Sequence, residues 1–219
     1  MIKQQDYRYE IKYPLEKYEF VLFKSFLKSS SIFLSKQHDD RLVESLYFDN
    51  IELQNFNNHV SGLGNREKIR LRWYSNNFQK LFFEIKEKKN RLSRKIIFEI
   101  NNTDNYDPGN KNDLLSIIKK SKKINNLIRC NSLKPILYTK FHRMYYTYLD
   151  IRLTVDKKMQ YKRFSGTRKL LFNKSPVYSV IEIKSDLKYK NQVTDISKVL
   201  NFRTFRHSKY VVGINSIFL

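Results

Sequence analysis

Lysine and arginine side chains recur at every second position in several short segments of the sequence. In residues 66–74 these positions are Lys68, Arg70 and Arg72, and apolar residues stand between them. Alternate side chains of an extended strand point to opposite faces, so this segment would present charge on one face and apolar groups on the other. Grouped basic side chains bind phosphate oxygens well. The pattern therefore indicates a polyanion-binding face.

Four other segments repeat this alternation, and they add carboxylates to the charged face. The charged positions are Arg8, Glu10 and Lys12 in 7–13, Glu84, Lys86 and Lys88 in 80–88, Arg152 and Asp156 in 150–156, and Glu182 and Lys184 in 180–184. Carboxylates beside phosphate-binding residues suit a divalent cation that is shared with the phosphates. We therefore expect Mg²⁺ or Mn²⁺ as a cofactor.

These charged segments belong to a series of expected strands. The sequence predicts strands at 7–13, 44–49, 66–74, 80–88, 93–100, 136–149, 150–157 and 177–184, and helices at 15–29, 51–60, 112–123 and 191–201. Strands and helices do not alternate regularly, which argues against a doubly wound parallel sheet. An antiparallel α+β fold is expected.

Two architectures satisfy the alternation. In an open antiparallel sheet the charged faces would simply be solvated, and periodicity alone favours this interpretation. In a closed eight-stranded β-barrel the charged residues would line the lumen, and the helices would pack on the apolar exterior. Eight strands leave room for side chains or one small ligand, and a chain of phosphates would balance the charge.

Composition supports a folded protein with a polyanionic partner. The chain has 219 residues with 43 Lys and Arg against 21 Asp and Glu, a net charge of +22, and 41% of its residues are hydrophobic. This apolar content excludes a disordered polycation. The single Cys130 predicts a reducing, cytoplasmic location. Few Gly and Pro residues and no long apolar segment favour one domain, 1–219, without a transmembrane helix.

Several motifs in order along the chain resemble a known family. They are RYEIKY (8–13), YFDN (47–50), KIRLRWY (68–74), FFEIKEK (82–88), SRK (93–95), KFHRMYY (140–146), RLTVD (152–156), VIEIK (180–184) and HSKYVVGI (207–214). Together they resemble the VTC domain of polyphosphate polymerases, a branch of the triphosphate tunnel metalloenzymes. The resemblance implies an eight-stranded antiparallel triphosphate tunnel that transfers the γ-phosphate of ATP onto a growing polyphosphate chain.

The resemblance also implies roles for individual residues. The expected catalytic residues are Lys12, Arg70, Arg72, Lys86, Arg143, Arg152 and Lys209. Further phosphate contacts are expected from Lys184, Arg206 and Ser208, and from either Arg94 or Lys95. Glu182 matches the metal-binding glutamate of the family, and Glu10 and Glu84 are additional candidates for metal ligands.

Three functions remain open at the level of sequence. A polymerase would take ATP and inorganic polyphosphate as substrates, without specific nucleic-acid binding and with any membrane association coming through a partner protein. Arg8 stands where the superfamily usually has an acidic residue, which favours this branch, whereas Phe141 replaces a frequent tyrosine. A tunnel triphosphatase would hydrolyse inorganic or nucleoside triphosphates instead. A non-catalytic binder of polyanions or nucleic acid is also compatible with the charge.

Overall fold

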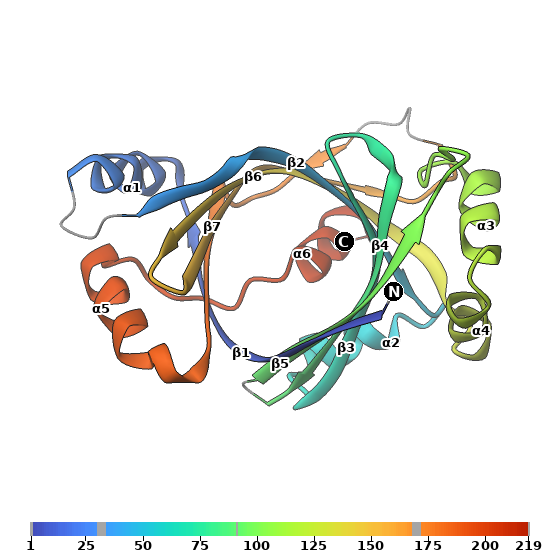
Figure 1. Cartoon of the computed structure of the whole chain (residues 1–219), viewed down its shortest axis with the longest axis horizontal. Helices are drawn as coiled ribbons and strands as arrows, with labels where there is room; N and C mark the ends of the chain where they lie inside the picture. Colours follow the sequence, from blue (N-terminus) through green and yellow to red (C-terminus); the bar gives the residue numbers. More distant parts are fainter. Residues whose placement is uncertain (1, 30–33, 91, 168–171, 219) are drawn as a thin grey trace.

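A large, curved antiparallel sheet organises the molecule (Figure 1). The computed structural model describes residues 2–29, 34–90, 92–167 and 172–218. Within these residues the strands are β1 (Ile2–Leu15), β2 (Ser35–Asp49), β3 (Asn65–Tyr74), β4 (Asn77–Lys89), β5 (Leu92–Asn101), β6 (Lys134–Tyr148), β7 (Ile151–Arg163), β8 (Asn173–Lys174) and β9 (Ser179–Ser185). The helices are α1 (Lys17–Ser29), α2 (Gln54–Val60), α3 (Lys111–Lys119), α4 (Lys122–Cys130), α5 (Lys190–Leu200) and α6 (Lys209–Phe218), with a 3₁₀ turn at Leu187–Tyr189.

The strand order of the sheet is β6-β2-β3-β4-β5-β1-β9-β7-β8, and β6 pairs in addition with β7. Each of the eight longer strands therefore has a hydrogen-bonded neighbour on both sides. The predicted α+β class and antiparallel pairing are confirmed. The predicted eight-stranded barrel is corrected to a nine-stranded sheet in the described part of the chain. The ninth strand is the two-residue β8, which pairs with β7 in addition to the eight longer strands.

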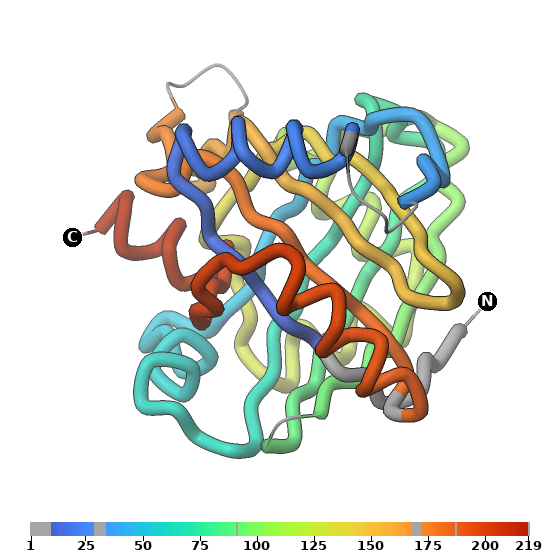
Figure 2. The backbone as a smooth tube through the Cα atoms, turned by 90° about the vertical axis from the view of Figure 1, so that its left-hand side faces the viewer, coloured from blue at the N-terminus to red at the C-terminus, as the bar shows by residue number. Residues whose placement is uncertain are grey.

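The convex face of the sheet is apolar and is covered by helices on two sides. Ile69, Leu71 and Trp73 of β3 lie in a buried cluster that includes residues of α3 and α4. On the opposite side, residues of β1, β7 and β9 pack in a second cluster with α1 and α5. Figure 2 shows α1 and α5 on this same outer side. The alternation predicted from the sequence thus directs the apolar residues outward, under helices.

Helix α6 differs from the others, because it lies within the curve of the sheet (Figure 1). Its Tyr210 and Ile214 pack against inward-facing residues of β2 and β6, such as Val43 and Leu137. Gly213 allows the close approach, since a Cβ there would come within 2.6 Å of Leu137 Cδ2. The expectation that all helices pack outside the sheet is therefore wrong for α6.

Two local predictions also change. The helix expected at 15–29 begins at Lys17 instead, because Pro14 and Leu15 still pair with Val180 and Ser179 of β9. The segment after α3 forms a further helix, α4, whose N-cap Ser121 accepts a hydrogen bond from the Ile124 amide. None of the helices formed by the described residues is long and apolar enough to cross a membrane.

Candidate phosphate-binding site

The concave side of the sheet encloses a cavity of about 180 Å³ whose walls are mainly cationic. Every long strand contributes to it, and so does the start of α6. The basic side chains among its lining residues are Lys12, Lys68, Arg70, Arg72, Lys86, Arg94, Lys95, Arg143, Arg152, Lys184 and Lys209. Only two carboxylates, those of Glu10 and Glu182, join them in the lining. This inner cavity has the composition of an anion-binding site.

Strand register brings these residues together from distant parts of the chain. Lys86 lies opposite Lys95 on β5 as well as Lys68 on β3, so three ammonium-bearing positions follow one another across the sheet. On the other side of the cavity, Lys12 of β1 lies opposite Glu182 of β9. Directly opposed residues point to the same face, about 5 Å apart. The pairing thus places the alternate charged residues of neighbouring strands side by side, and together they form a continuous charged surface.

Glu84 acts as a counter-ion behind the basic residues. Its carboxylate accepts hydrogen bonds from Arg70 Nε at 2.6 Å and from Lys95 Nζ at 2.7 Å, and Arg72 lies 3.9 Å away. Burial would raise the pKa of Glu84, but the cations, Arg70 first among them, hold this pKa well below its usual value. Both carboxylate oxygens are thus engaged, and Glu84 does not border the inner cavity.

Asp156 plays the same part for the opposite wall. It accepts hydrogen bonds from Arg143 Nε and Nη2 at 2.6 and 2.7 Å, and Lys209 Nζ lies at 2.5 Å. The Arg143 guanidinium and the Lys209 ammonium also lie over the Phe141 ring, at 5.2 and 4.7 Å from its centre. Bidentate pairing and the aromatic face fix the direction of both cations.

Glu10 and Glu182 are the carboxylates best placed for a divalent cation. Glu10 accepts from Lys86 Nζ at 2.6 Å, whereas the contacts of Glu182 with Lys184, Lys12 and Arg143 are longer, at 3.2 to 3.9 Å. No group of three His, Cys, Asp or Glu side chains in the described residues could hold a metal alone. Mg²⁺ commonly uses one or two carboxylates together with substrate phosphates. This donor set fits an ion that is shared with bound phosphate.

The basic residues outnumber their counter-ions, and the pKa values of several lysines reflect this. Burial first, and then Lys12 and Lys86, lower the pKa of Lys68 well below its usual value. Burial lowers the pKa of Lys95 to about 7 and that of Lys184 to about 8, against the partial compensation of Glu84 and Glu182. A bound polyanion would reverse these shifts, because an opposite charge favours the protonated form.

The start of α6 adds uncharged polar groups to the same wall. Ser208 precedes the helix, and its hydroxyl accepts a hydrogen bond from Lys68 Nζ at 2.7 Å. The Val211 amide donates to the same hydroxyl at 3.4 Å. The N-terminus of a helix favours negative charge, because its first amides have no partners within the helix.

Most of the residues expected from the sequence border the inner cavity, although Glu84 does not, and three others differ in detail. Arg206 borders two neighbouring cavities rather than the inner one, and Arg152 lines the inner cavity from an exposed position. Arg94 and Lys95 have different partners: Arg94 hydrogen-bonds to Glu87, whereas Lys95 reaches Glu84 within the charged cluster. We therefore assign the inward-directed role to Lys95.

Three residues of the site were given no role on the basis of the sequence. The alternation did place Lys68 and Asp156 on the charged faces of their strands, but neither was among the expected catalytic, phosphate-binding or metal-binding residues. Tyr47 carried no such signal. Its hydroxyl accepts from Arg70 Nη1 at 3.0 Å, and although burial raises the pKa of Tyr47, Arg70 and Arg72 bring it below its usual value.

Solved structures with the same fold come from bacteria, archaea and plants. A protein from Bacillus halodurans described as a candidate adenylate cyclase matches with a TM-score of 0.59 and 14% identity, over 94% of this chain and 95% of that one. A candidate adenylyl cyclase from Hippeastrum, reported to have a dominant triphosphatase activity, gives 0.58 and 14% over 98% of both chains. A conserved protein from Pyrococcus furiosus gives 0.54 and 14%, over 93% and 99%.

Sequence comparison is more specific than the likeness of folds. None of the curated proteins matches the sequence. The VTC domain, in contrast, matches residues 7–218. This range includes every residue that lines the inner cavity and every helix of the described residues. The chain therefore belongs to the VTC domain family, within the triphosphate tunnel metalloenzyme superfamily.

Proposed function

We propose that this protein is a metal-dependent polyphosphate polymerase that uses ATP as the phosphate donor. The observation that carries the proposal is the inner cavity, where eleven basic residues face only two carboxylates. Such a surface suits a ligand with several adjacent negative charges. The VTC domain match supports a polymer as the product, and the curved sheet would act as the tunnel around it.

The reaction needs positioning and charge neutralisation more than proton transfer. A terminal oxygen of the polyphosphate chain attacks the γ-phosphorus of ATP, a new P–O–P bond forms, the bond to the β-phosphate oxygen breaks, and ADP leaves. The acceptor oxygen is already anionic, so it needs no general base. Arg70, Arg72 and Arg143 would hold the transferred group from opposite walls, and charge on its oxygens would be stabilised as it develops.

The carboxylates divide into two roles in this proposal. Glu84 and Asp156 keep the guanidinium groups oriented through the hydrogen bonds at 2.6 to 2.7 Å. Glu182, with Glu10 beside it, would hold the divalent cation. A divalent cation held there, Mg²⁺ or Mn²⁺, would supply positive charge that offsets the negative charge of the bound phosphates. Lys12 and Lys184, near Glu182, would balance the remaining charge of the phosphates.

The decisive experiment incubates the purified protein with ATP and either Mn²⁺ or Mg²⁺, and follows both ADP and polyphosphate. We expect long polyphosphate in the wild type and at least a ~100-fold loss of turnover in Arg70→Ala and Arg72→Ala. The exposed Lys119 on α3 provides a charge-matched control, Lys119→Ala, which should retain full activity.

Free phosphate without polymer would assign the protein to the triphosphatases instead, the activity reported for the Hippeastrum protein of this fold. Normal polymer synthesis by both arginine variants would exclude the inner cavity as the active site. Glu182→Gln tests the metal assignment, because unchanged dependence of activity on Mn²⁺ or Mg²⁺ would leave Glu182 with a structural role only.

A further inference from the structure

Helix α1 buries only one of its faces. Phe20 and Phe23 lie in the cluster that α1 shares with β1, β7, β9 and α5. Tyr18, Val21 and Leu22 lie on the other side of the helix, with exposed fractions of 66%, 51% and 57%. Figure 2 shows α1 along the outer edge of the molecule. The helix therefore presents an apolar strip, Tyr18, Val21 and Leu22, to its surroundings.

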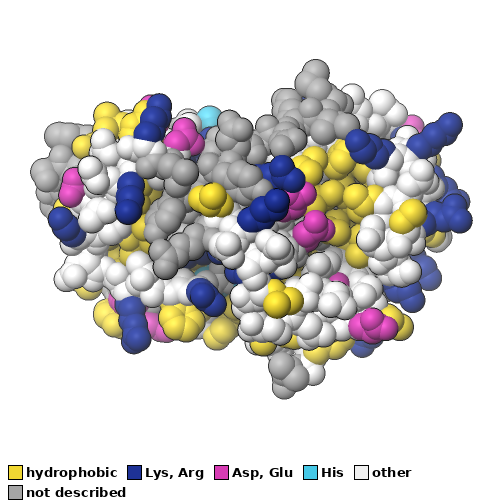
Figure 3. All heavy atoms as spheres, turned by 90° about the horizontal axis from the view of Figure 1, so that it is seen from below, with side chains coloured by type: hydrophobic (Ala, Val, Ile, Leu, Met, Phe, Trp, Pro, Cys, Tyr) yellow, Lys and Arg dark blue, Asp and Glu magenta, His cyan; other side chains and the backbone are white. Residues whose placement is uncertain are grey.

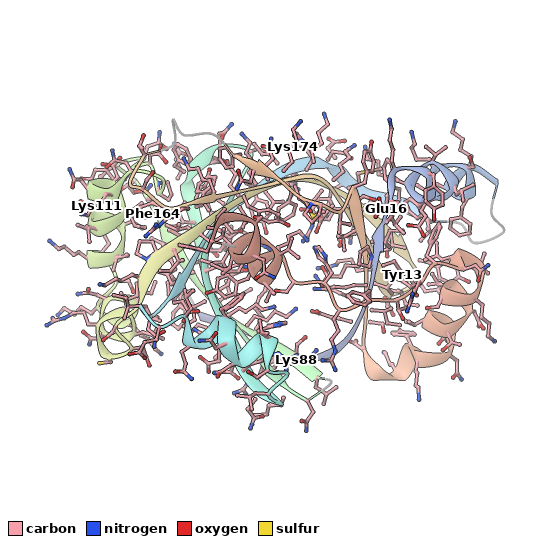
Figure 4. All side chains as sticks on the ribbon, turned by 180° about the vertical axis from the view of Figure 1, so that it is seen from behind. Tyr13, Glu16, Lys88, Lys111, Phe164 and Lys174 are labelled. Atoms are coloured by element: carbon pink, nitrogen blue, oxygen red, sulfur yellow. The ribbon has the colours of Figure 1, made fainter. Side chains whose placement is uncertain are left out.

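The apolar surface continues beyond the helix. The ring of Tyr178, which is 45% exposed, lies 5.4 Å from the ring of Phe20 between centres, so it stands next to α1. Figure 4 labels Glu16 where β1 leads into α1. An open hollow of about 460 Å³ lies at this end of the helix, bordered by Glu16, Lys17, Tyr18 and Val21. Large apolar side chains that gather at the surface mark a place where another molecule or a membrane binds.

Three lysines stand beside the apolar strip. Lys17, Lys24 and Lys28 are exposed, and they follow one another at intervals of seven and four residues. These intervals place them on one flank of a helix with about 3.6 residues per turn. Glu19, the one carboxylate within α1, falls on the opposite flank and accepts a hydrogen bond from the Glu16 amide. The cations of the helix are thus separated from its carboxylate, and they border the apolar strip.

We propose that α1 docks on an anionic membrane surface, with the apolar strip among the lipid headgroups and the lysine flank against their phosphates. At 13 residues the helix is too short to cross the hydrocarbon core, so it would lie in the plane of the interface.

The side chains of α1 suit this position. Lysine lays its long apolar stem along an apolar surface while its ammonium group reaches the charged headgroups. Tyrosine is enriched at the interface between membrane and water, where Tyr18 and Tyr178 would lie. The inference is independent of the reaction in the inner cavity, because α1 packs on the outer side of the sheet.

A second copy of the chain is the competing occupant of the apolar strip. Each copy carries a net charge of +22, so two copies repel each other, and a dimer would leave the lysine flanks without anions. A membrane that contains anionic lipid attracts the whole molecule and also covers the strip. Charge therefore favours the bilayer over self-association.

The test measures co-sedimentation of the full chain with vesicles of phosphatidylcholine, either pure or with about 30% phosphatidylserine. We expect strong binding only to the vesicles that contain phosphatidylserine. The double variant Val21→Ser/Leu22→Ser should weaken this binding at least ~10-fold, because it removes most of the inserted apolar surface. The matched variant Val60→Ser/Leu115→Ser, at exposed positions on α2 and α3, should bind like wild type.

Lysine variants test the electrostatic part of the inference. Lys24→Gln/Lys28→Gln should also lose at least ~10-fold in affinity, since one lysine near an anionic surface contributes roughly 5-fold. The control Lys119→Gln/Lys122→Gln removes the same charge from exposed positions on α3 and α4 and should change affinity by less than about 3-fold.

Insertion of the helix has a spectroscopic signature. In Tyr18→Trp the emission of the introduced indole should shift to shorter wavelength when vesicles are added. Trp73, the one tryptophan of the natural sequence, is fully buried and gives a constant background. An unchanged spectrum on bound vesicles would place α1 away from the membrane.

Other outcomes would also overturn the inference. Equal losses in the two lysine variants would mean that the vesicles respond only to the net charge of the molecule. Unchanged binding by Val21→Ser/Leu22→Ser would leave the apolar strip outside the membrane. Sedimentation equilibrium without vesicles tests the competing occupant, because a wild-type dimer that becomes a monomer in Val21→Ser/Leu22→Ser would assign the strip to a second copy.

Discussion

The concave side of the sheet has two contrasting parts, although the same strands build both. On β6, Phe141 packs against α6, and two residues later Arg143 enters the charged cavity. On β9, Val180 belongs to the apolar part and Glu182 to the charged one. Residues two apart share a face, so the change from apolar to charged occurs along each strand. The position of a residue along its strand therefore decides its role as much as its face does.

Aromatic residues join the two parts. The ring of Tyr47 stacks on Tyr210 of α6 at 5.1 Å between centres, and its hydroxyl accepts a hydrogen bond from Arg70. The apolar part thus holds α6 in place, and α6 in turn presents Lys209 and Ser208 to the charged part. Outside the sheet, in contrast, Lys and Arg side chains are scattered over the face seen in Figure 3 rather than gathered in one patch.

Removing a counter-ion from the charged part should have the largest effect. Asp156→Ala leaves Arg143 and Lys209 buried without their shared carboxylate, so we expect a loss of about 3–5 kcal/mol in the free energy of unfolding. Urea denaturation without ligand measures this loss. Added tripolyphosphate should restore part of the stability, since it supplies the missing negative charge.

Asp156→Asn serves as the matched control, because it keeps the shape and one acceptor oxygen. If Asp156→Ala were as stable as wild type, the charged part would not depend on buried counter-ions, and the contrast with the apolar part would disappear.

Crowding the apolar part should cost less. In Gly213→Ala the new Cβ would lie 2.6 Å from Leu137 Cδ2 and 2.9 Å from Tyr161 Cδ1, so the packing must shift. We expect a loss of about 1–3 kcal/mol, measured in the same way. In contrast to Asp156→Ala, tripolyphosphate should stabilise this variant only as much as it stabilises wild type. A larger rescue would show that α6 and the charged cavity are more strongly coupled than their contacts indicate.

Removing one of the excess cations should instead increase the stability of the ligand-free protein. Burial and neighbouring cations lower the pKa of Lys68, so its charge destabilises the ligand-free fold. We expect Lys68→Met to be slightly more stable than wild type without ligand and to bind tripolyphosphate several-fold more weakly, as thermal unfolding with and without ligand would reveal. Tighter binding of tripolyphosphate by Lys68→Met would contradict the proposal that the excess of basic residues serves to bind phosphate.

Stability should also depend on pH. Burial lowers the pKa of Lys95 to about 7 and that of Lys184 to about 8, from a usual 10.5. At a pH between these lowered values and 10.5, the unfolded chain therefore binds more protons than the folded chain. Ligand-free stability should rise as pH increases above about 7. Affinity for tripolyphosphate should fall over the same range. The double variant Lys95→Met/Lys184→Met should flatten both profiles, and unchanged profiles would exclude these two lysines as the cause.

Much of the charged face could be predicted because it depends only on backbone geometry. The period of two placed Arg70, Arg72 and Lys86 on one face, and the sheet confirms that arrangement. The choice between Arg94 and Lys95 needed the register of β4 with β5, which no local pattern encodes. The place of α6 could not be predicted either, since it depends on a fit between Gly213 and residues more than fifty positions away.

The position of β1 has a consequence for how the protein folds. This strand, at the start of the sequence, lies between β5 and β9, so its neighbours come from the middle and the far end of the chain. Sheets built from such distant pairings form slowly, because long loops must close before any contact rewards them. The cationic cavity can exist only after that step. Polyphosphate should therefore slow unfolding without speeding folding, and would lengthen the lifetime of the folded protein.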